Sequence, residues 1–185
     1  MIENKEVELK MLLTKEEFYS LLEYYQPANF IKQTNHYFSS DNKSNYQSIR
    51  IREKEGKYLF TLKEKQDGYV QEYEKYTDSL TIENDEEIIN ILNNRKLYAP
   101  YYEIGQLTTE RYTHIIQNKA ELCFDINTYY GITDYEIEYE VTHPHNHLED
   151  FLAILQQANI TFKENPISKV KRCLQQKEAV TVKKL

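Results

Sequence analysis

The sequence predicts an α+β fold in which antiparallel strands form a closed sheet with a charged interior and helices pack outside. Several segments alternate with period two between apolar and charged residues, as strands with two different faces do. Other segments place apolar residues at the spacing of an amphipathic helix. Only four Gly and four Pro occur in the 185 residues, and no linker-like tract divides them. We therefore expect a single domain over residues 1–185.

The helical signals are local. Thr14 and Glu17 have the spacing of a capping box at the start of a helix that is expected to end near Pro27. Further helices are expected over the ranges 84–95, 146–157 and 168–176. In the range 146–157 the predicted buried stripe consists of Leu148, Phe151, Leu152 and Leu155.

The charged residues of the predicted strands come in rows of one sign. Residues two apart on a strand share a face, and like charges there repel each other unless opposite charges face them. A solvated face is the simplest interpretation of any one strand. Its repetition along the chain instead favours faces that close inward and bring both signs together around a ligand. The rows are Glu6/Glu8, Arg50/Arg52, Lys63/Lys65, Glu72/Glu74 and Glu136/Glu138/Glu140, with Lys10 on the same face as Glu6 and Glu8 and with Arg111 and Asp125 on further strands.

The composition excludes several classes of function. The formal net charge is −7, whereas a general nucleic-acid binder needs a clustered surplus of Lys and Arg, so no nucleic-acid partner is expected. No run approaches the roughly 20 apolar residues of a membrane span. The N-terminal sequence has no apolar signal-peptide core, so we expect a cytoplasmic protein without a membrane partner. Cys123 and Cys173 are too few for a disulfide framework and are expected to be buried thiols.

The acidic residues of the predicted interior outnumber the basic ones. Such a cavity would repel a polyanion unless bound cations compensated the excess negative charge. Carboxylate oxygens suit Mg²⁺ or Mn²⁺, and these ions, together with Arg and Lys side chains, would bind phosphate oxygens. The sequence therefore predicts a divalent metal ion and a phosphate-bearing small molecule as ligands.

One further motif, His143-Pro-His-Asn-His147, also suggests metal binding. Pro144 interrupts the preceding strand, however, and places the histidines at a turn before a helix. A polar loop is therefore the expected structure.

The motifs, taken in order, resemble the CYTH superfamily, the triphosphate tunnel metalloenzymes. Glu6-Val-Glu-Leu-Lys10 matches the family's E-x-E-x-K strand at the N-terminus. The resemblance covers residues 3 to 172. Within the superfamily, the length and local sequence of the chain are most similar to those of small stand-alone proteins from Gram-positive bacteria. It implies a closed tunnel, or barrel, of eight antiparallel strands lined by charged side chains. The other matching motifs are Arg50-Ile-Arg52, Thr61-Leu-Lys63-Glu-Lys65, Glu72-Tyr-Glu74, Arg111, Asp125, Glu136-Ile-Glu138 and Ser168-Lys169.

The resemblance also implies a role for each motif. The attacking water is expected to be oriented or deprotonated by Glu72 or Glu74, between which the sequence does not choose. Lys171 and Arg172 are alternatives to Lys169 for contact with the phosphate chain. The expected metal ligands are Glu6, Glu8, Asp125, Glu136 and Glu138. The expected phosphate-binding residues are Lys10, Arg50, Arg52, Lys63, Lys65, Arg111 and Lys169.

The implied activity is metal-dependent hydrolysis of a triphosphate, most simply inorganic tripolyphosphate, with water as the nucleophile. A class IV-type adenylate cyclase would use the same residues but needs a base and ribose pocket, for which no residue set is found. A thiamine triphosphatase is a third alternative, although Trp, which the family often places on the thiamine ring, is absent. A non-catalytic polyphosphate- or nucleotide-binding module is the fourth, because binding does not require turnover.

Overall fold

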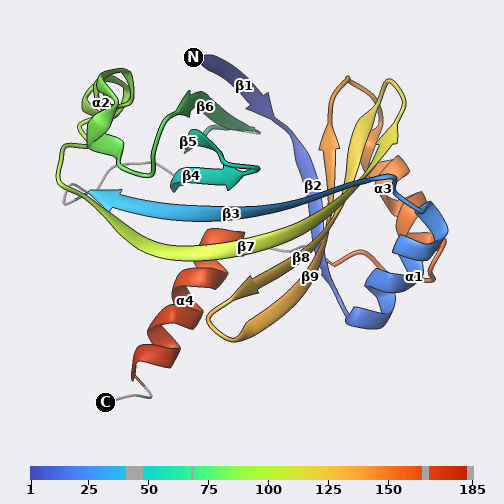
Figure 1. The fold of residues 1–185 in the computed structure, drawn as a ribbon. Coiled ribbons are helices and arrows are strands. Elements are labelled where there is room, and N and C mark those ends of the chain that lie inside the picture. The colour runs from blue at the N-terminus through green and yellow to red at the C-terminus, as the bar shows by residue number, and fades with distance from the viewer. Residues whose placement is uncertain (41–47, 68, 164–166, 183–185) are drawn as a thin grey trace. The chain divides into compact units, whose positions relative to one another are not determined.

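The computed structural model describes residues 1–40, 48–67, 69–163 and 167–182. These residues form nine strands, four α-helices and one short 3₁₀ helix, and Figure 1 shows how the strands and α-helices are arranged. The strands are β1 (Ile2–Glu6), β2 (Glu8–Leu13), β3 (Asn29–Ser40), β4 (Ser48–Lys54), β5 (Lys57–Lys65), β6 (Val70–Thr77), β7 (Tyr101–Ile116), β8 (Ala120–Tyr129) and β9 (Ile132–Val141). The helices are α1 (Lys15–Tyr25), η1 (Ile82–Asn84), α2 (Glu86–Asn93), α3 (His147–Gln156) and α4 (Lys169–Val182).

The strands form one sheet in the order β1-β6-β5-β4-β3-β7-β8-β9-β2. The order begins with β1 and ends with β2, which follow one another in the chain with only Val7 between them. The predicted fold class is confirmed. The strand count is nine rather than eight because the first predicted strand is interrupted at Val7.

Two tight turns fix the register of the hairpins that carry most of the charged residues. Glu55 and Gly56 connect β4 to β5 with φ values of 50° and 73°, and Tyr130 and Gly131 connect β8 to β9 with φ values of 42° and 80°. Two-residue loops with both φ values positive match the twist of the flanking strands. The register decides which charges face each other, because a one-residue slip would move every side chain to the opposite face.

The chain forms two compact units. The first comprises Met1–Glu6, Gln33–Thr108 and Lys169–Leu185, and the second comprises Val7–Lys32 and Thr109–Ser168. Strands β3 and β7 contribute residues to both. Neither unit is a continuous stretch of sequence, which agrees with the lack of a linker-like tract. The single domain over residues 1–185 stays a prediction.

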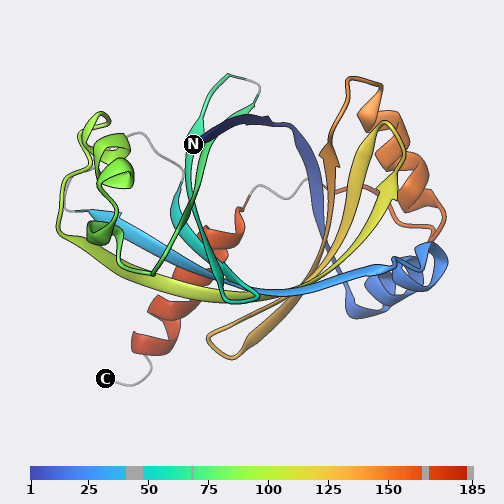
Figure 2. The ribbon, with the colours of Figure 1, turned by 45° about the horizontal axis from the view of Figure 1, so that its top comes forward.

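In the second unit, α1 and α3 pack on the apolar face of β2, β8 and β9 (Figure 2). The predicted capping box of α1 is present, because Glu17 N donates to Thr14 Oγ1 and Thr14 N donates to Glu17 Oε2. The core of this unit contains Phe18 and Leu21 from α1, Leu122 and Phe124 from β8, Ile137 and Tyr139 from β9, and Phe151 and Leu155 from α3.

The buried stripe of α3 differs from the prediction. Phe151 and Leu155 are buried as expected, but Leu148 and Leu152 are 46% and 42% exposed, and Ile154 is buried instead. The helix is apolar on more than one side, so the sequence does not show which side meets the sheet. Packing against the core of the second unit selects the side that carries Ile154.

In the first unit, α2 packs on the apolar face of β4 and β5. Asp85 caps this helix by accepting hydrogen bonds from the backbone N–H groups of Glu87 and Ile88. Helix α4 lies along β7, where Cys173 Sγ and Lys177 Nζ donate to the backbone oxygens of Gln106 and Ile104 (Figure 1). It continues to Val182, beyond the predicted end at residue 176. The core contains Ile49, Ile51, Phe60, Leu62, Ile88, Ile91 and Leu92.

Both cysteines are buried, as predicted. None of the helices in the described residues combines the length and the apolar character needed to cross a membrane.

Phe124 offers a test of the second unit's core. Its side chain is fully buried and its ring meets that of Phe18 edge to face at 6.0 Å. Phe124→Ala should lower the free energy of unfolding by about 3–5 kcal/mol, because the lost apolar contacts leave a cavity. Chemical denaturation would measure this. Leu152→Ala, at an exposed position of α3, should change stability by less than about 1 kcal/mol, and an equal effect of both variants would contradict the assigned core.

Candidate functional site

The charged rows of the strands lie opposite the apolar faces that the helices cover. Along β4, Ile49 and Ile51 belong to the core of the first unit, whereas Arg50 and Arg52 point to the other face. Along β9, Ile137 and Tyr139 belong to the core of the second unit and alternate with Glu136, Glu138 and Glu140. Many of these charged side chains are nevertheless removed from water: Asp125 and Glu136 are 0% exposed, Glu138 5% and Arg50 8%.

The charged face of the first unit gathers basic side chains around Tyr37. Burial raises the pKa of the Tyr37 hydroxyl, and the positive charges of Arg50, Lys169 and Arg52 act against this increase. These three cations therefore lie near one buried hydroxyl, although they come from β4 and from the start of α4. The structure thus brings together three of the predicted phosphate-binding residues.

Arg50 and Arg52 are oriented by polar neighbours. Arg50 Nη2 donates to Thr61 Oγ1 at 2.9 Å, and Arg52 Nε donates to Asn35 Oδ1 at 2.9 Å. Arg50 Nε is buried without a hydrogen-bond partner within the described part of the chain. A buried N–H donor without an acceptor lowers the stability of the fold, and a ligand that accepts a hydrogen bond from it would remove this penalty.

Lys63 lies between two carboxylates on the same face of the first unit. Its Nζ is 2.7 Å from Glu6 Oε2 and 2.5 Å from Glu72 Oε1. Register explains the second contact, because Lys63 and Glu72 are directly opposite on β5 and β6. Glu74, two residues further on, accepts from Thr61 Oγ1 at 3.4 Å and from Asn4 Nδ2 at 3.5 Å. The two candidates for the water-activating residue, Glu72 and Glu74, therefore have different partners. Lys65, a predicted phosphate-binding residue, is exposed to solvent.

The charged face of the second unit is dominated by carboxylates, and Arg111 of β7 contacts three of them. Its Nε and Nη2 donate to Asp125 Oδ1 and Oδ2 at 2.8 and 2.7 Å. Its Nη2 also donates to Glu138 Oε2, and its Nη1 donates to Glu140 Oε1 at 2.7 Å. Burial would lower the pKa of Arg111, but the three carboxylates reverse this and raise it well above its ordinary value.

Three carboxylates of this face, Glu8, Glu138 and Glu140, form what we call the three-carboxylate group. One oxygen of each lies within 4.8 Å of the others. Lys10 Nζ donates to Glu8 Oε1. Burial would lower the pKa of Lys10, and the charges of Glu8 and Glu138 raise it above its ordinary value.

Strand register produces this grouping. Glu140 of β9 is directly opposite Glu8 on β2 and Glu121 on β8, and Glu138 is opposite Lys10 and Cys123. Glu8 and Glu138 were predicted ligands, whereas Glu140 was not. The signal for Glu140 was present in the sequence, since it continues the row of Glu136 and Glu138 with period two.

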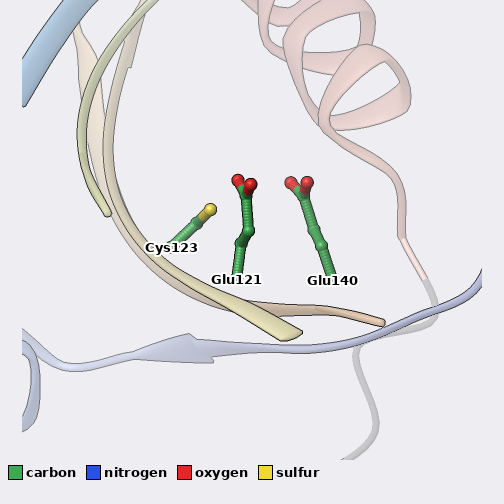
Figure 3. A group of neighbouring side chains, drawn as sticks. All are labelled: Glu121, Cys123 and Glu140. Atoms are coloured by element: carbon green, nitrogen blue, oxygen red, sulfur yellow. The ribbon is translucent and has the colours of Figure 1, made fainter. Parts of the chain in front are cut away.

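A second group, Glu121, Cys123 and Glu140, also brings possible ligand atoms within 4.8 Å of one another. Figure 3 shows the carboxylates of Glu121 and Glu140 side by side, with the sulfur of Cys123 on the Glu121 side. Burial raises the pKa of the Cys123 thiol, and neighbouring carboxylates add to this against the opposing charge of Arg111. Mg²⁺ and Mn²⁺ prefer oxygen ligands, whereas a thiolate suits softer metals. The three-carboxylate group, which offers oxygen atoms alone, is therefore the better candidate.

The other predicted ligands lie in different surroundings. Asp125 is held by Arg111, and Glu136 is within 3.5 Å of Asn127 Nδ2. Glu6 belongs to the first unit and contacts Lys63.

The first four residues of the histidine motif form a loop, as predicted, and His147 begins α3. His145 Nε2 lies 2.8 Å from Tyr139 Oη, and its Nδ1 lies 2.7 Å from the backbone oxygen of His143. Both ring nitrogens of His145 thus have partners within the loop and the adjoining strand. A pocket of about 320 Å³ lies beside it, lined by Val7, Val141, Thr142, His143, Pro144, His145 and His147.

Rows of carboxylates and of basic side chains lie on the faces of the antiparallel sheet opposite its helices, and several of these side chains are buried, an arrangement typical of proteins with charged ligands. The family model of the CYTH domain matches residues 4–174, and the chain belongs to the CYTH domain family.

Relatives of this chain carry two kinds of names. This chain is 30% identical over 175 residues to the candidate triphosphatase YjbK of Bacillus subtilis. The alignment covers 89% of this chain and 92% of YjbK. A crystal structure of a candidate adenylate cyclase from Bacillus halodurans is 30% identical and superposes with a TM-score of 0.78, covering 93% of this chain and 98% of the other.

A more distant structure shares the fold. HpAC1 of Hippeastrum, a candidate adenylyl cyclase described as having a dominant triphosphatase activity, is 18% identical with a TM-score of 0.71. The superposition covers 92% of this chain and 95% of HpAC1.

Glu140 should give the metal-free protein a distinctive pH dependence. Burial raises its pKa, and Glu138 and Asp125 add to the increase against the opposing effect of Arg111. A raised carboxyl pKa stabilises the fold below the unfolded-state pKa, and that contribution is lost as pH rises through the folded-state pKa. With a chelator present, Glu140→Gln should therefore be more stable than wild type at pH 8 and equally stable at pH 4. Thermal unfolding at both pH values checks this, and a variant less stable than wild type at pH 8 would show that ionised Glu140 is a net stabilising partner of Arg111.

Proposed function

We propose that the protein hydrolyses triphosphates in a reaction that depends on a divalent metal ion, with water as the nucleophile and inorganic tripolyphosphate as the simplest substrate. The observation that carries the proposal is the burial of two kinds of charged face, one rich in carboxylates and one rich in Arg and Lys. Hydrolysis of a polyphosphate with a divalent cation needs both kinds of site, because the cation requires oxygen ligands and the phosphates require cationic donors.

The three-carboxylate group fits Mg²⁺ or Mn²⁺. Both ions prefer oxygen ligands, and the oxygens of Glu8, Glu138 and Glu140 are already within 4.8 Å of one another. We assign these residues as the cation ligands, and Glu6 and Glu136 stay predicted ligands. The bound ion would neutralise phosphate charge and lower the pKa of a coordinated water.

Arg50, Arg52, Lys63 and Lys169 are assigned to phosphate binding. The unpartnered Nε of Arg50 supports this role, because a phosphate oxygen could accept from it. The planar guanidinium groups of Arg50 and Arg52 match the geometry of phosphate oxygens, and the ammonium groups of Lys63 and Lys169 add charge. These donors would stabilise the negative charge that spreads over the transferred phosphoryl group.

Glu72 is assigned as the residue that orients or deprotonates the attacking water. Its contact with Lys63 connects it to the phosphate-binding residues, whereas Glu74 is in contact with the neutral side chains of Thr61 and Asn4. Glu74 stays the alternative.

The competing functions use the same residues. The likeness to the candidate adenylate cyclase from Bacillus halodurans favours nucleotide cyclisation as the second candidate. Thiamine triphosphate hydrolysis would require a different substrate. Non-catalytic binding would require the same ligand contacts without turnover. The small-molecule triphosphate partner and the cytoplasmic location stay part of the proposal.

A substrate panel tests these alternatives. The purified protein would be incubated with tripolyphosphate, ATP, GTP or thiamine triphosphate, each with Mg²⁺ or Mn²⁺, while orthophosphate and cyclic AMP are measured. We expect orthophosphate release that is fastest with tripolyphosphate and that a chelator abolishes. Cyclic AMP from ATP would favour the cyclase, and tight tripolyphosphate binding without phosphate release would favour a binding module.

Glu72→Gln should lower kcat for tripolyphosphate by a factor of about 100 or more, because proton transfer by a positioned side chain contributes about 10²–10⁴-fold. Tripolyphosphate binding, measured by calorimetry with Ca²⁺ in place of the activating metal, should be retained. Glu64→Gln is a matched control, since Glu64 is a half-buried glutamate of β5 that pairs with Arg95. Equal losses of turnover and binding in Glu72→Gln would assign Glu72 a structural role.

A further inference from the structure

We propose that Arg111 is an internal counter-ion for the carboxylates that the proposed function assigns to the divalent cation. In the cation-free protein the guanidinium group of Arg111 is paired with the carboxylates of Glu138 and Glu140. These two contacts must break before the carboxylates can bind the ion. The inference rests on the proposed function and extends it, because it separates the role of Arg111 from that of Asp125 and makes cation binding and phosphate binding depend on each other.

Each member of the three-carboxylate group is paired with a cation of the chain itself. Lys10 Nζ donates to Glu8 Oε1, Arg111 Nη2 donates to Glu138 Oε2, and Arg111 Nη1 donates to Glu140 Oε1. Divalent cations hold carboxylate oxygens at about 2.0–2.6 Å, and their charge repels a guanidinium group at such a short range. The ion and Arg111 therefore compete for Glu138 and Glu140.

Asp125 holds Arg111 through a separate contact. Both of its oxygens accept from the guanidinium group, from Nε at 2.8 Å and from Nη2 at 2.7 Å. Asp125 is fully buried and is not a member of the three-carboxylate group. When Glu138 and Glu140 are released, this two-point contact keeps the guanidinium group in place and leaves Nη1 able to donate to a phosphate oxygen. Asp125 is thus a positioning residue for Arg111, whereas the sequence predicted a metal ligand.

This arrangement couples the two ligands. Cation binding frees the Arg111 donor that a phosphate needs, and phosphate binding holds Arg111 away from the carboxylates that the cation needs. By thermodynamic linkage, each ligand then raises the affinity of the other by the same factor.

The test measures cation binding in the absence of any triphosphate. Arg111→Gln removes the competing charge, so Mn²⁺ should bind to the metal-free variant about tenfold more tightly than to wild type in a calorimetric titration. Arg111→Lys keeps the charge but loses the forked contact, and its affinity should lie between the two. Lys119→Gln is the control, because Lys119 pairs with Asp150 in the same unit and outside the cluster, and it should leave Mn²⁺ affinity unchanged.

Thermal unfolding gives a second measurement. Without metal, Arg111→Gln leaves three carboxylates without their common partner and should have a lower Tm than wild type. Added Mn²⁺ should raise the Tm of this variant more than that of wild type. If Arg111→Gln does not fold even with Mn²⁺, the affinity of Arg111→Lys decides, and a value equal to or weaker than that of wild type would overturn the inference.

Equal or weaker Mn²⁺ binding by folded Arg111→Gln would also overturn the inference, because Arg111 would then organise the carboxylates for the ion and not compete with it. That result would leave the proposed function standing, provided that wild type binds Mn²⁺ and releases phosphate from tripolyphosphate. Absence of Mn²⁺ binding in wild type and in both Arg111 variants would overturn the proposed cation site itself, and this inference with it.

Discussion

Charge removed from water, and the need to compensate it, is the constraint on which the rest of this structure depends. A buried carboxylate is tolerated only where hydrogen bonds or opposite charges replace its hydration. Asp125, Glu138 and Glu140 meet this requirement by sharing Arg111, and Glu6 and Glu72 meet it by sharing Lys63. The chain's own cations therefore compensate these carboxylates only in part, because three carboxylates share one guanidinium group and two share one ammonium group.

The helices matter to this arrangement because they cover the other face of the strands. Apolar side chains such as Ile51 and Phe124 are buried beneath α2 in the first unit and beneath α1 in the second. Because strand residues alternate between faces, this packing forces Arg52 and Asp125 to the opposite side. The same hydrophobic burial that stabilises the fold thus fixes the orientation of the charged residues, and the hairpin turns at Gly56 and Gly131 fix their register.

Buried ion pairs of this kind add little net stability, because desolvation offsets much of the attraction. We propose that their value lies in holding side chains in place and in making cation and anion binding depend on each other. The network around Arg111 illustrates this point, since one guanidinium group contacts one carboxylate through two donors and two others through one each. Such a group can exchange some partners and keep its position.

The sequence by itself determined the features that depend on near neighbours in the chain. Thr14 and Glu17 specified the start of α1, and the period-two rows specified which residues share a face, because both are set by backbone geometry. Only the tertiary structure decided which rows meet. Glu140 joins Glu8 because β9 pairs with β2, more than a hundred residues away, and Ile154 is buried in place of Leu148 and Leu152 because of the surface that α3 meets. Local pattern fixes the direction of a side chain, whereas its partners depend on strand pairing between distant segments.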